Sequence, residues 1–254
     1  MRNLTLVALG WLAMLPGLAQ AQPVAASPTL LEAWLAWQEE RQTRQAPAFD
    51  WAYSFALKAN DAQGLEQRRR RLVAELEVLS NALALARDSD TADALTDWQR
   101  ALSSLPALPA RSPRRLGLPH LASDLRRNPA MGDIAALGTC QPPAWIETWT
   151  LEGVERLPWT PGMTADQALA SLPAGATRGI DRVTLVTPLG ETRDLGIAAW
   201  NHEAAPLAPG SRLVSRLPQR GLGGTVEGDL VNRELAAWLA TRLPGDDCTI
   251  RDVE

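Results

Sequence analysis

The chain has 254 residues, 46% of them hydrophobic, and its 25 lysines and arginines against 29 aspartates and glutamates give a formal net charge of −4. A chain of this length can bury one large core or two small ones, and its slightly acidic balance argues against a nucleic acid as partner. Its two histidines, His120 and His202, lie far apart and outside any HxxxH spacing, so we expect no zinc site and no cofactor.

The first residues have the pattern of a secretory signal peptide. Arg2 precedes an apolar run from Leu4 to Leu18, which ends in the small-residue sequence Ala19-Gln20-Ala21. A membrane anchor is the alternative, but a run of about 15 residues is shorter than the roughly 20 that a spanning helix needs. We therefore expect residues 1–21 to be removed and the mature protein to be exported, with no later transmembrane segment.

The next segment, residues 22–50, predicts a short helix that begins after a Ser-Pro-Thr sequence. Trp34 and Trp37 lie on this helix. They could stack on sugar rings, but tryptophans at helical spacing more often fill a core.

Residues 61–105 predict a helical hairpin. A leucine stripe predicts a helix of roughly 25 residues from Asp61, and the sequence RDSDTAD at 87–93 ends it. A second stripe follows, so two antiparallel helices are expected. The two stripes consist of Leu65, Leu72, Leu76, Leu79 and Leu83 and of Leu95, Trp98, Leu102 and Leu105.

Four consecutive arginines, Arg68 to Arg71, lie on the first of these helices. Such a run could bind an anionic glycan or lipid. Because four consecutive residues point around most of a helix, a solvated face is the better interpretation.

Residues 106–144 are rich in proline and predict short strands and turns that complete a first domain, residues 22–144. The linker that follows is expected at Gln141-Pro142-Pro143. An exported chain meets an oxidising environment, in which an even pair of cysteines tends to be joined. We expect a disulfide between Cys140 and Cys248, which would fasten the tail to this linker; a metal site is the alternative, but it lacks further ligands.

Residues 145–222 predict a β-grasp domain. WIETWTLEG and VERLPW predict two strands, and Thr164 and Gln167 form the capping box of a short helix. IDRVTLVT and ETRDLG predict two further strands, joined by a turn that needs a positive φ at Gly190, and PGSRLVSRL from Pro209 predicts a fifth. One helix across a sheet in the order β-β-α-β-β is the β-grasp arrangement.

Residues 226–243 predict an amphipathic helix, with a cap at Asp229 and an end at Pro244-Gly245. About 14 residues at about 1.5 Å each give about 21 Å, which is too short to span a hydrocarbon core of about 30 Å. The helix therefore docks either on the protein's own domains or on a partner protein. Its apolar stripe consists of Val231, Leu235, Trp238 and Leu239.

Several short motifs along residues 146–217 resemble the GfcC family of capsule-biosynthesis proteins. Each motif is weak alone, but together their order and spacing are similar to those of the family. The motifs are Leu157-Pro158-Trp159 with Gly162, Thr187-Pro188 with Gly190-Glu191-Thr192, Ala199-Trp200-Asn201, and Pro209-Gly210-Ser211. The helical hairpin also resembles the one that the family inserts in its first domain.

The resemblance implies an α+β fold with two β-grasp domains, a helical hairpin in the first, and a C-terminal amphipathic helix. These modules are similar to the soluble-ligand-binding β-grasp domains of outer-membrane polysaccharide exporters. The start of the chain departs from the pattern, because an alternating strand pair is expected there and the sequence reads QPVAASPTLLEAWLAW. Whether the first β-grasp domain is complete therefore stays open, as does the oligomeric state.

The implied function is an accessory role in capsule or exopolysaccharide assembly and export, through binding of polysaccharide or of the outer-membrane export machinery. Contact with glycan is assigned to Trp159, Trp200 and Asn201, because the family motifs carry them and an aromatic face beside an amide suits a sugar ring. The alternative is that both tryptophans fill the small core.

A polysaccharide-modifying enzyme of the periplasm is the alternative function, and the residues give it little support. The sequence has no GxSxG motif for a serine nucleophile. Paired carboxylates could cleave a glycosidic bond, but no pattern singles out a pair. The candidates are Glu147, Glu152, Asp181, Glu191 and Asp194.

Overall fold

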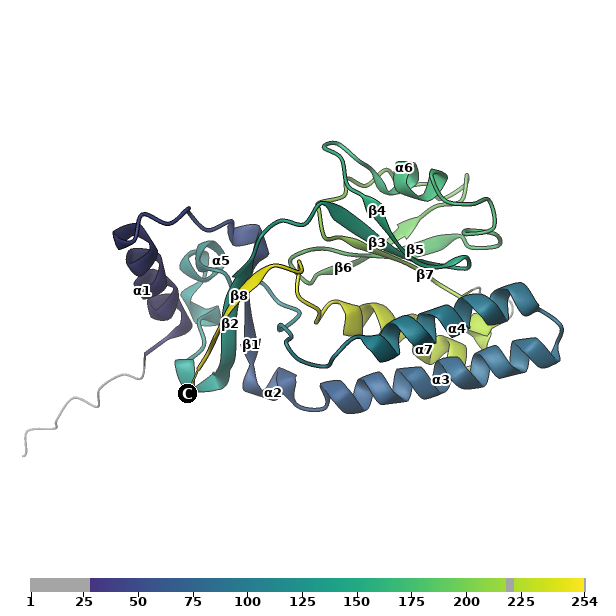
Figure 1. The fold of residues 1–254 in the computed structure, drawn as a ribbon, viewed down its shortest axis with the longest axis horizontal. Coiled ribbons are helices and arrows are strands. Elements are labelled where there is room, and N and C mark those ends of the chain that lie inside the picture. Colours follow the sequence, from purple (N-terminus) through teal and green to yellow (C-terminus); the bar gives the residue numbers. More distant parts are fainter. Residues whose placement is uncertain (1–27, 218–221, 254) are drawn as a thin grey trace, which may run out of the picture.

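The computed structural model is α+β, as expected, and contains two separate sheets (Figure 1). It describes residues 28–217 and 222–253, so the predicted signal peptide at 1–21 lies outside the described residues. One sheet has three strands and the other has five. In the described part of the chain, no helix is both long and apolar enough to cross a bilayer.

The first sheet joins segments from the two ends of the described chain. Its antiparallel strands are β1 (Ser54–Lys58), β2 (Ile134–Cys140) and β8 (Cys248–Asp252), with β2 in the centre. The resemblance implied a first β-grasp domain in residues 22–144 whose completeness stayed open, and no element was predicted for the tail beyond Pro244-Gly245. The described residues instead give a three-stranded sheet whose third strand comes from the carboxyl end, because β8 pairs with β2 from Cys140↔Cys248 to Ala136↔Asp252.

The predicted disulfide between Cys140 and Cys248 is confirmed. Cys140 is the last residue of β2 and Cys248 the first of β8, and the two are direct partners in the strand register. Cys140 is buried, and it packs with Tyr53 and Phe55. The bond therefore fixes the register of β8 as well as the position of the tail.

Short helices and aromatic side chains cover the first sheet. Helix α1 (Leu30–Thr43) is capped by Thr29 and buries Trp34 and Trp37, so both tryptophans belong to the core. The indole of Trp34 donates to the Leu116 carbonyl at 2.8 Å. The remaining elements of this layer are η1 (Trp51–Tyr53), α5 (Leu118–Ser123), η2 (Leu125–Arg127) and η3 (Met131–Asp133).

The predicted helical hairpin is present and extends away from the first sheet (Figure 1). The single helix expected from Asp61 is divided into α2 (Ala59–Ala62) and α3 (Leu65–Leu85), because Gly64 between them adopts φ +74°. Helix α4 (Ser89–Ser104) begins at a cap whose Asp88 carboxylate accepts from the Thr91 amide. Four leucines of the α3 stripe, Leu72 to Leu83, are buried against α4, α7 and the second sheet, whereas Leu65 packs with Leu57 and Ala136 of the first sheet.

The second sheet has the strand order β4-β3-β7-β5-β6, with β7 parallel to β3 in the centre. Helix α6 (Ala165–Ala170) crosses one face, and the Gln167 side chain accepts from the Thr164 amide as a capping box requires. The Thr164 hydroxyl itself is buried without a partner among the described residues. The strands are β3 (Trp145–Thr150), β4 (Gly153–Pro158), β5 (Arg182–Val186), β6 (Thr192–Gly196) and β7 (Arg212–Ser215).

The turn between β5 and β6 needs a glycine, as predicted, because Gly190 has φ +82°. A side chain there would also place its Cβ 3.1 Å from the Ala240 carbonyl. We expect Gly190→Val to lower the free energy of unfolding by about 1 kcal/mol or more in urea titrations. Gly132→Val is the control, since a Cβ at Gly132 meets no atom within 4 Å; equal losses in the two variants would contradict the interpretation.

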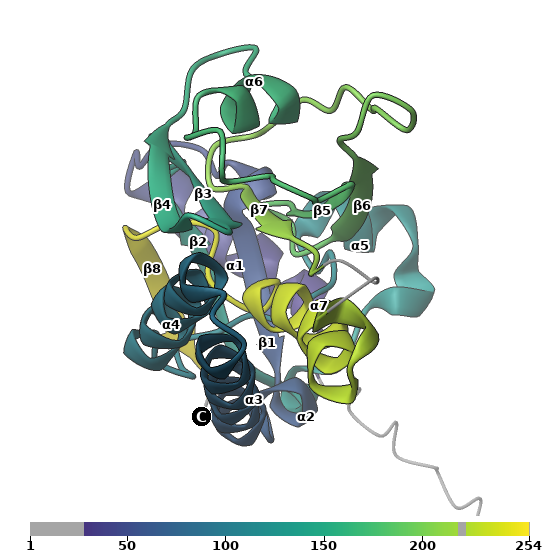
Figure 2. The same cartoon turned by 90° about the vertical axis from the view of Figure 1, so that its right-hand side faces the viewer.

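Helix α7 (Val226–Leu239) lies below the second sheet and beside the hairpin (Figure 2). Its N-cap is Thr225 and not the predicted Asp229, because the Thr225 hydroxyl accepts from the Gly228 amide at 3.0 Å. The regular helix ends before the predicted Leu243, since the chain tightens after Leu239 into i→i−3 bonds such as Arg242 to the Leu239 carbonyl. The side of α7 that faces away from solvent carries Val231, Leu235, Trp238 and Leu239, each at most 1% exposed.

Candidate functional site

A groove of 650 Å³ opens at the surface where the first sheet meets the β5–β6 turn. We call it the basic groove. Its lining comes from Lys58 at the end of β1, the segment 113–116, helix α5, the 3-10 helices η2 and η3, and Glu191 in the β5–β6 turn. Its charged or titratable lining residues are Lys58, Arg114, Arg115, His120, Arg126, Arg127, Asp133 and Glu191.

The groove has the opposite charge from the whole chain. Five of its lining residues are lysine or arginine and two, Asp133 and Glu191, are carboxylates. The chain as a whole has a formal net charge of −4. Positive charge is therefore concentrated here, and a concave surface with an excess of one sign attracts ligands of the other.

Two of the arginines have carboxylate partners at the rim of the groove. Arg115 donates to both oxygens of Glu191 at 2.6 Å, and the Arg127 Nε lies 3.1 Å from Asp124. Arg127 also lies 3.2 Å from Nε2 of His120.

The other three cations of the basic groove are available to a ligand. Lys58, Arg114 and Arg126 form no ion pair with any residue that the structure describes, and both arginines are exposed. Free guanidinium groups can each bind a carboxylate or phosphate through two parallel hydrogen bonds. The groove thus presents unpaired anion-binding groups on a defined wall.

A buried arginine fixes the segment that carries Arg114 and Arg115. The Arg111 amide donates to the Thr241 carbonyl at 2.8 Å, and its guanidinium donates to the carbonyls of Ala240 and Thr187 at 3.0 and 3.1 Å. Burial lowers the pKa of Arg111 to about 9. Arg111 therefore ties the groove wall to the end of α7 and to the β5–β6 turn.

A second cleft of 340 Å³ continues the basic groove, since the two share Arg114, Arg115, Leu116 and His120 as lining residues. We call it the tryptophan arm, because its lining includes Trp51. The rest of its lining carries no charge and consists of Ala52, Ser54, Gly117, Pro119, Ser123 and Leu189. Trp51 is half-buried and is held by Trp34 and Phe49, whose ring centroids lie 5.5 and 4.9 Å away.

The glycan contacts predicted from the sequence lie outside these two clefts. Trp159 is half-buried against the α6 core, and its indole donates to the Leu207 carbonyl at 2.8 Å. Trp200 is 73% exposed, so it does not fill the core as the alternative interpretation held. The side-chain oxygen of Asn201 accepts from the Ala198 backbone amide at 2.9 Å, and its side-chain nitrogen donates to the Asp181 carbonyl at 3.0 Å. Of the three, Trp200 alone presents most of its side chain to solvent.

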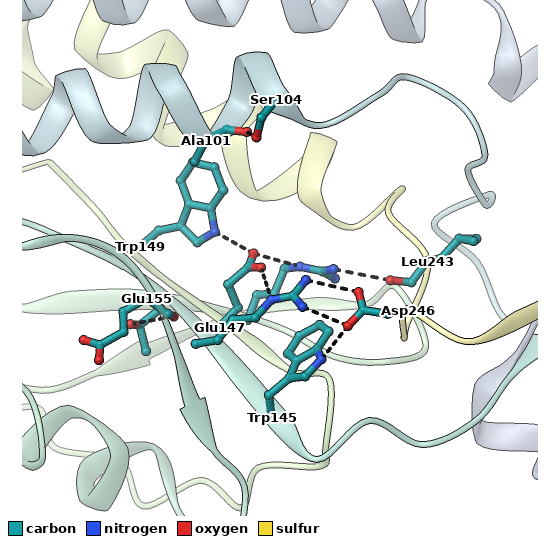
Figure 3. A network of polar contacts seen from close by, with 11 residues as sticks. Ala101, Ser104, Trp145, Glu147, Trp149, Glu155, Leu243 and Asp246 are labelled. Atoms are coloured by element: carbon teal, nitrogen blue, oxygen red, sulfur yellow. Dashed lines mark hydrogen bonds and ion pairs between the residues drawn. The ribbon is translucent and has the colours of Figure 1, made fainter.

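Among the candidate carboxylates, Glu147 lies in a buried network that Figure 3 shows. Its oxygens accept from the Trp149 indole at 2.8 Å and from Arg212 at 3.2 Å and Arg156 at 3.3 Å. Burial lowers the pKa of Arg212, and the neighbouring charge of Glu147 opposes that effect. The network connects β3, β4 and β7 inside the protein, so Glu147 has a structural role here.

The same network reaches the tail of the chain. Asp246 accepts from the Trp145 indole and from Arg156, both at 2.8 Å, and Arg212 donates to the Leu243 carbonyl at 3.3 Å (Figure 3). Residues 243–246 connect α7 to β8. The network therefore holds the passage of the chain from the second sheet to the first.

The other candidate carboxylates are also held individually. Glu191 binds Arg115, and Asp194 binds Arg216 and accepts from the Thr184 hydroxyl at 2.7 Å. Glu152 lies in the turn after β3, and Asp181 directly precedes β5. Among the described residues, no two of the five candidate carboxylates line the same cleft.

Sequence analysis missed the basic groove, although its charges are visible in RSPRRLG at 111–117 and DLRR at 124–127. It considered only the run Arg68 to Arg71, of which Arg69 and Arg70 bind Glu66 and Arg71 approaches Glu75. Those contacts are typical of a solvated helix face. Two short arginine clusters in a proline-rich segment were the signal that could have indicated the groove.

Residues 153–244 match the family described as capsule biosynthesis GfcC C-terminal. The match covers just over a third of the chain, from β4 through the second sheet to the residues after α7. It confirms the resemblance drawn from the motifs and connects the chain with capsule biosynthesis. Together with the disulfide, it indicates an extracytoplasmic protein.

Proposed function

We propose that this member of the capsule biosynthesis GfcC C-terminal family is a periplasmic accessory protein of capsule or exopolysaccharide assembly and export, and that it acts by binding polysaccharide. The observation that carries the proposal is the basic groove with its tryptophan arm. The two clefts, of 650 and 340 Å³, have the size usual for ligand sites. Their lining combines cations, which bind acidic groups on sugars, with an aromatic ring, which packs against the face of a sugar ring.

We infer that residues 145–222 form a β-grasp domain of the kind found in soluble-ligand-binding modules of exporters. The order β4-β3-β7-β5-β6, with α6 across one face, supports this inference. The first sheet has three strands in the described residues and uses β8, so we do not extend the inference to it. The two parts of the protein then have different roles, and the groove lies between them.

Binding is favoured over catalysis because three of the five candidate carboxylates, Glu147, Glu191 and Asp194, are paired with arginines. Glycoside cleavage needs two carboxyl groups about 5 to 10 Å apart around the scissile bond. Glu147 is 6% exposed and bound to arginines, and Glu191 is bound to Arg115. An enzyme of polysaccharide modification remains the alternative that the experiment below tests.

Helix α7 is less suited than the groove to meet a partner protein. Its four stripe residues are buried against the hairpin and the second sheet, so docking on another protein would first expose them. Exposing a large apolar side chain costs about 1.5 to 3 kcal/mol. We therefore assign any contact with the export machinery to surfaces other than this stripe.

The proposal is tested with the mature protein and oligosaccharides from the capsule of the strain that encodes it. We expect saturable binding in calorimetry, no new reducing ends, and loss of surface polysaccharide when the gene is deleted. Release of reducing ends would establish the enzyme alternative. Loss of capsule without any binding would indicate a protein partner and contradict the proposal.

Trp200→Ala separates glycan contact from a structural role in the same assay. Because Trp200 is 73% exposed, we expect the free energy of unfolding to change by less than about 0.5 kcal/mol. If Trp200 stacks on the glycan, the affinity falls by about tenfold, since aromatic contacts of this kind are worth about 1 to 3 kcal/mol. An unchanged affinity would remove Trp200 from the site and leave the groove as the place of binding.

A further inference from the structure

We propose that the basic groove and the tryptophan arm together bind an acidic segment of polysaccharide, in which sugar carboxylates pair with Arg114 and Arg126 and a sugar ring lies against Trp51. This inference rests on the proposed function and specifies its ligand. The acidic sugar lies at the end lined by Lys58 and η2. The chain of sugars then continues past Arg115 and His120 to the end of the arm that Trp51 and Leu189 line.

The distribution of charge in the basic groove favours an anionic ligand. Five cations against two carboxylates line the basic groove, and Glu191 is already neutralised by Arg115. Arg114 and Arg126 are exposed and unpaired among the described residues, so their donors are free. A carboxylate on a sugar ring offers two coplanar oxygens, which match the paired donors of a guanidinium.

The continuity of the two clefts selects a chain of sugars over a small anion. They share four lining residues, and apart from the shared Arg114, Arg115 and His120 the lining of the arm carries no charged or titratable group. A phosphate ion or a single acid would use only the charged end. The uncharged end, with Trp51, Pro119 and Leu189, suits the apolar face of a neighbouring sugar ring.

The Arg115–Glu191 pair lies where the basic groove meets the tryptophan arm, and Glu191 offsets the positive charge that Arg115 offers to a ligand. Both side chains are nearly half-exposed, at 46% and 45%, so the pair contributes little to stability. Glu191 competes with a ligand carboxylate for Arg115. Removal of the Glu191 charge should therefore strengthen binding, which is an effect that a purely structural role of this pair does not produce.

The test uses the full mature chain with three probes of equal length: an oligogalacturonate, a neutral malto-oligosaccharide and an oligoglutamate peptide. Calorimetry should detect the oligogalacturonate, with an affinity that falls as salt is added. Arg114→Gln with Arg126→Gln should weaken it by about tenfold or more, because each removes a charged hydrogen-bonding group. Glu191→Gln should strengthen it by about threefold.

The matched control is Arg178→Gln with Arg182→Gln, which removes the same charge from two exposed arginines outside the groove. We expect the control to retain wild-type affinity within about twofold. Equal losses in the two double variants would show a general charge effect and overturn the site.

The remaining outcomes distinguish this inference from the proposed function. Equal binding of the malto-oligosaccharide would overturn the acidic ligand and leave glycan binding in place. Stronger binding of the oligoglutamate would identify a docking site for an acidic protein segment. If the oligogalacturonate binds and the Arg114 and Arg126 variant binds equally well, the glycan site lies elsewhere and only the inference fails. If none of the three probes binds, the inference fails, while capsular oligosaccharides still test the function.

Discussion

Replacing Cys140 and Cys248 together by serine is expected to lower the free energy of unfolding by about 4 to 5 kcal/mol. The disulfide closes a loop of 108 residues, and the chain-entropy model assigns a loop of this size roughly that stabilisation through the unfolded state. Urea unfolding followed by tryptophan fluorescence measures the difference. The reduced wild-type protein is the control and should unfold with the serine variant, because both lack the bond.

In the double serine variant, the loss of stability should begin with the first sheet. Strand β8 is an edge strand that pairs only with β2, and several of its residues are exposed. Without the disulfide, we expect the amides of Thr249 and Arg251 to exchange faster than those of Val183 and Leu185 in the second sheet. A serine variant with the wild-type urea midpoint, and with β8 amides still protected, would contradict this account.

Glu147→Ala is expected to cost about 3 to 5 kcal/mol, because it leaves the charge of a buried arginine uncompensated. Arg212 has a side chain 6% exposed and relies on Glu147 as its carboxylate partner. The substitution also removes the acceptor of the Trp149 indole. Thermal and urea unfolding measure the loss.

Two further variants separate the buried pair from a general charge effect. Glu203→Gln breaks the Arg193–Glu203 pair, which is exposed at 59% and 43%, and should cost about 1 kcal/mol or less. Glu147→Leu combined with Arg212→Met replaces the buried pair by apolar side chains and should cost less than Glu147→Ala alone. Equal losses in the free energy of unfolding for Glu147→Ala and Glu203→Gln would show that burial does not determine how much the network contributes to stability.

The second sheet was predictable because its signals are local. The turn at Gly190, the start of α6 with Gln167 and the extended segment of β3 each depend on signals within a few residues. Short connections then pair β3 with β4 and β5 with β6, and the fifth predicted strand, β7, lies between β3 and β5. Helix α7 was also predicted from its apolar stripe, although its first residue was wrong by one turn.

Strand β8 was not predictable in the same way. Its pairing with β2 joins residues separated by 108 positions, and the segment itself has weak alternation and mostly exposed side chains. The cysteine pair was correctly assigned from its compartment, yet an assigned bond does not specify a strand register. The break at Gly64 was missed as well, because the predicted helix was started at Asp61, whereas the leucine stripe begins only at Leu65.

The candidate site was the least predictable part. The basic groove forms only when Lys58, Arg114, Arg126 and Glu191 come together from four segments. Each segment is short, and none has a periodic pattern. Trp159 and Trp200 show the other difficulty, because the same residue type is half-buried at one position and 73% exposed at the other.

The position of β8 has a consequence for biosynthesis. A ribosome makes β1 and β2 long before β8, so the nascent amino-terminal half displays an open β2 edge while the second sheet is still being made. An exposed strand edge of this kind pairs readily with other chains. Expression systems that fuse bulky partners after residue 253, or that stall translation early, should therefore accumulate chains that associate through β2.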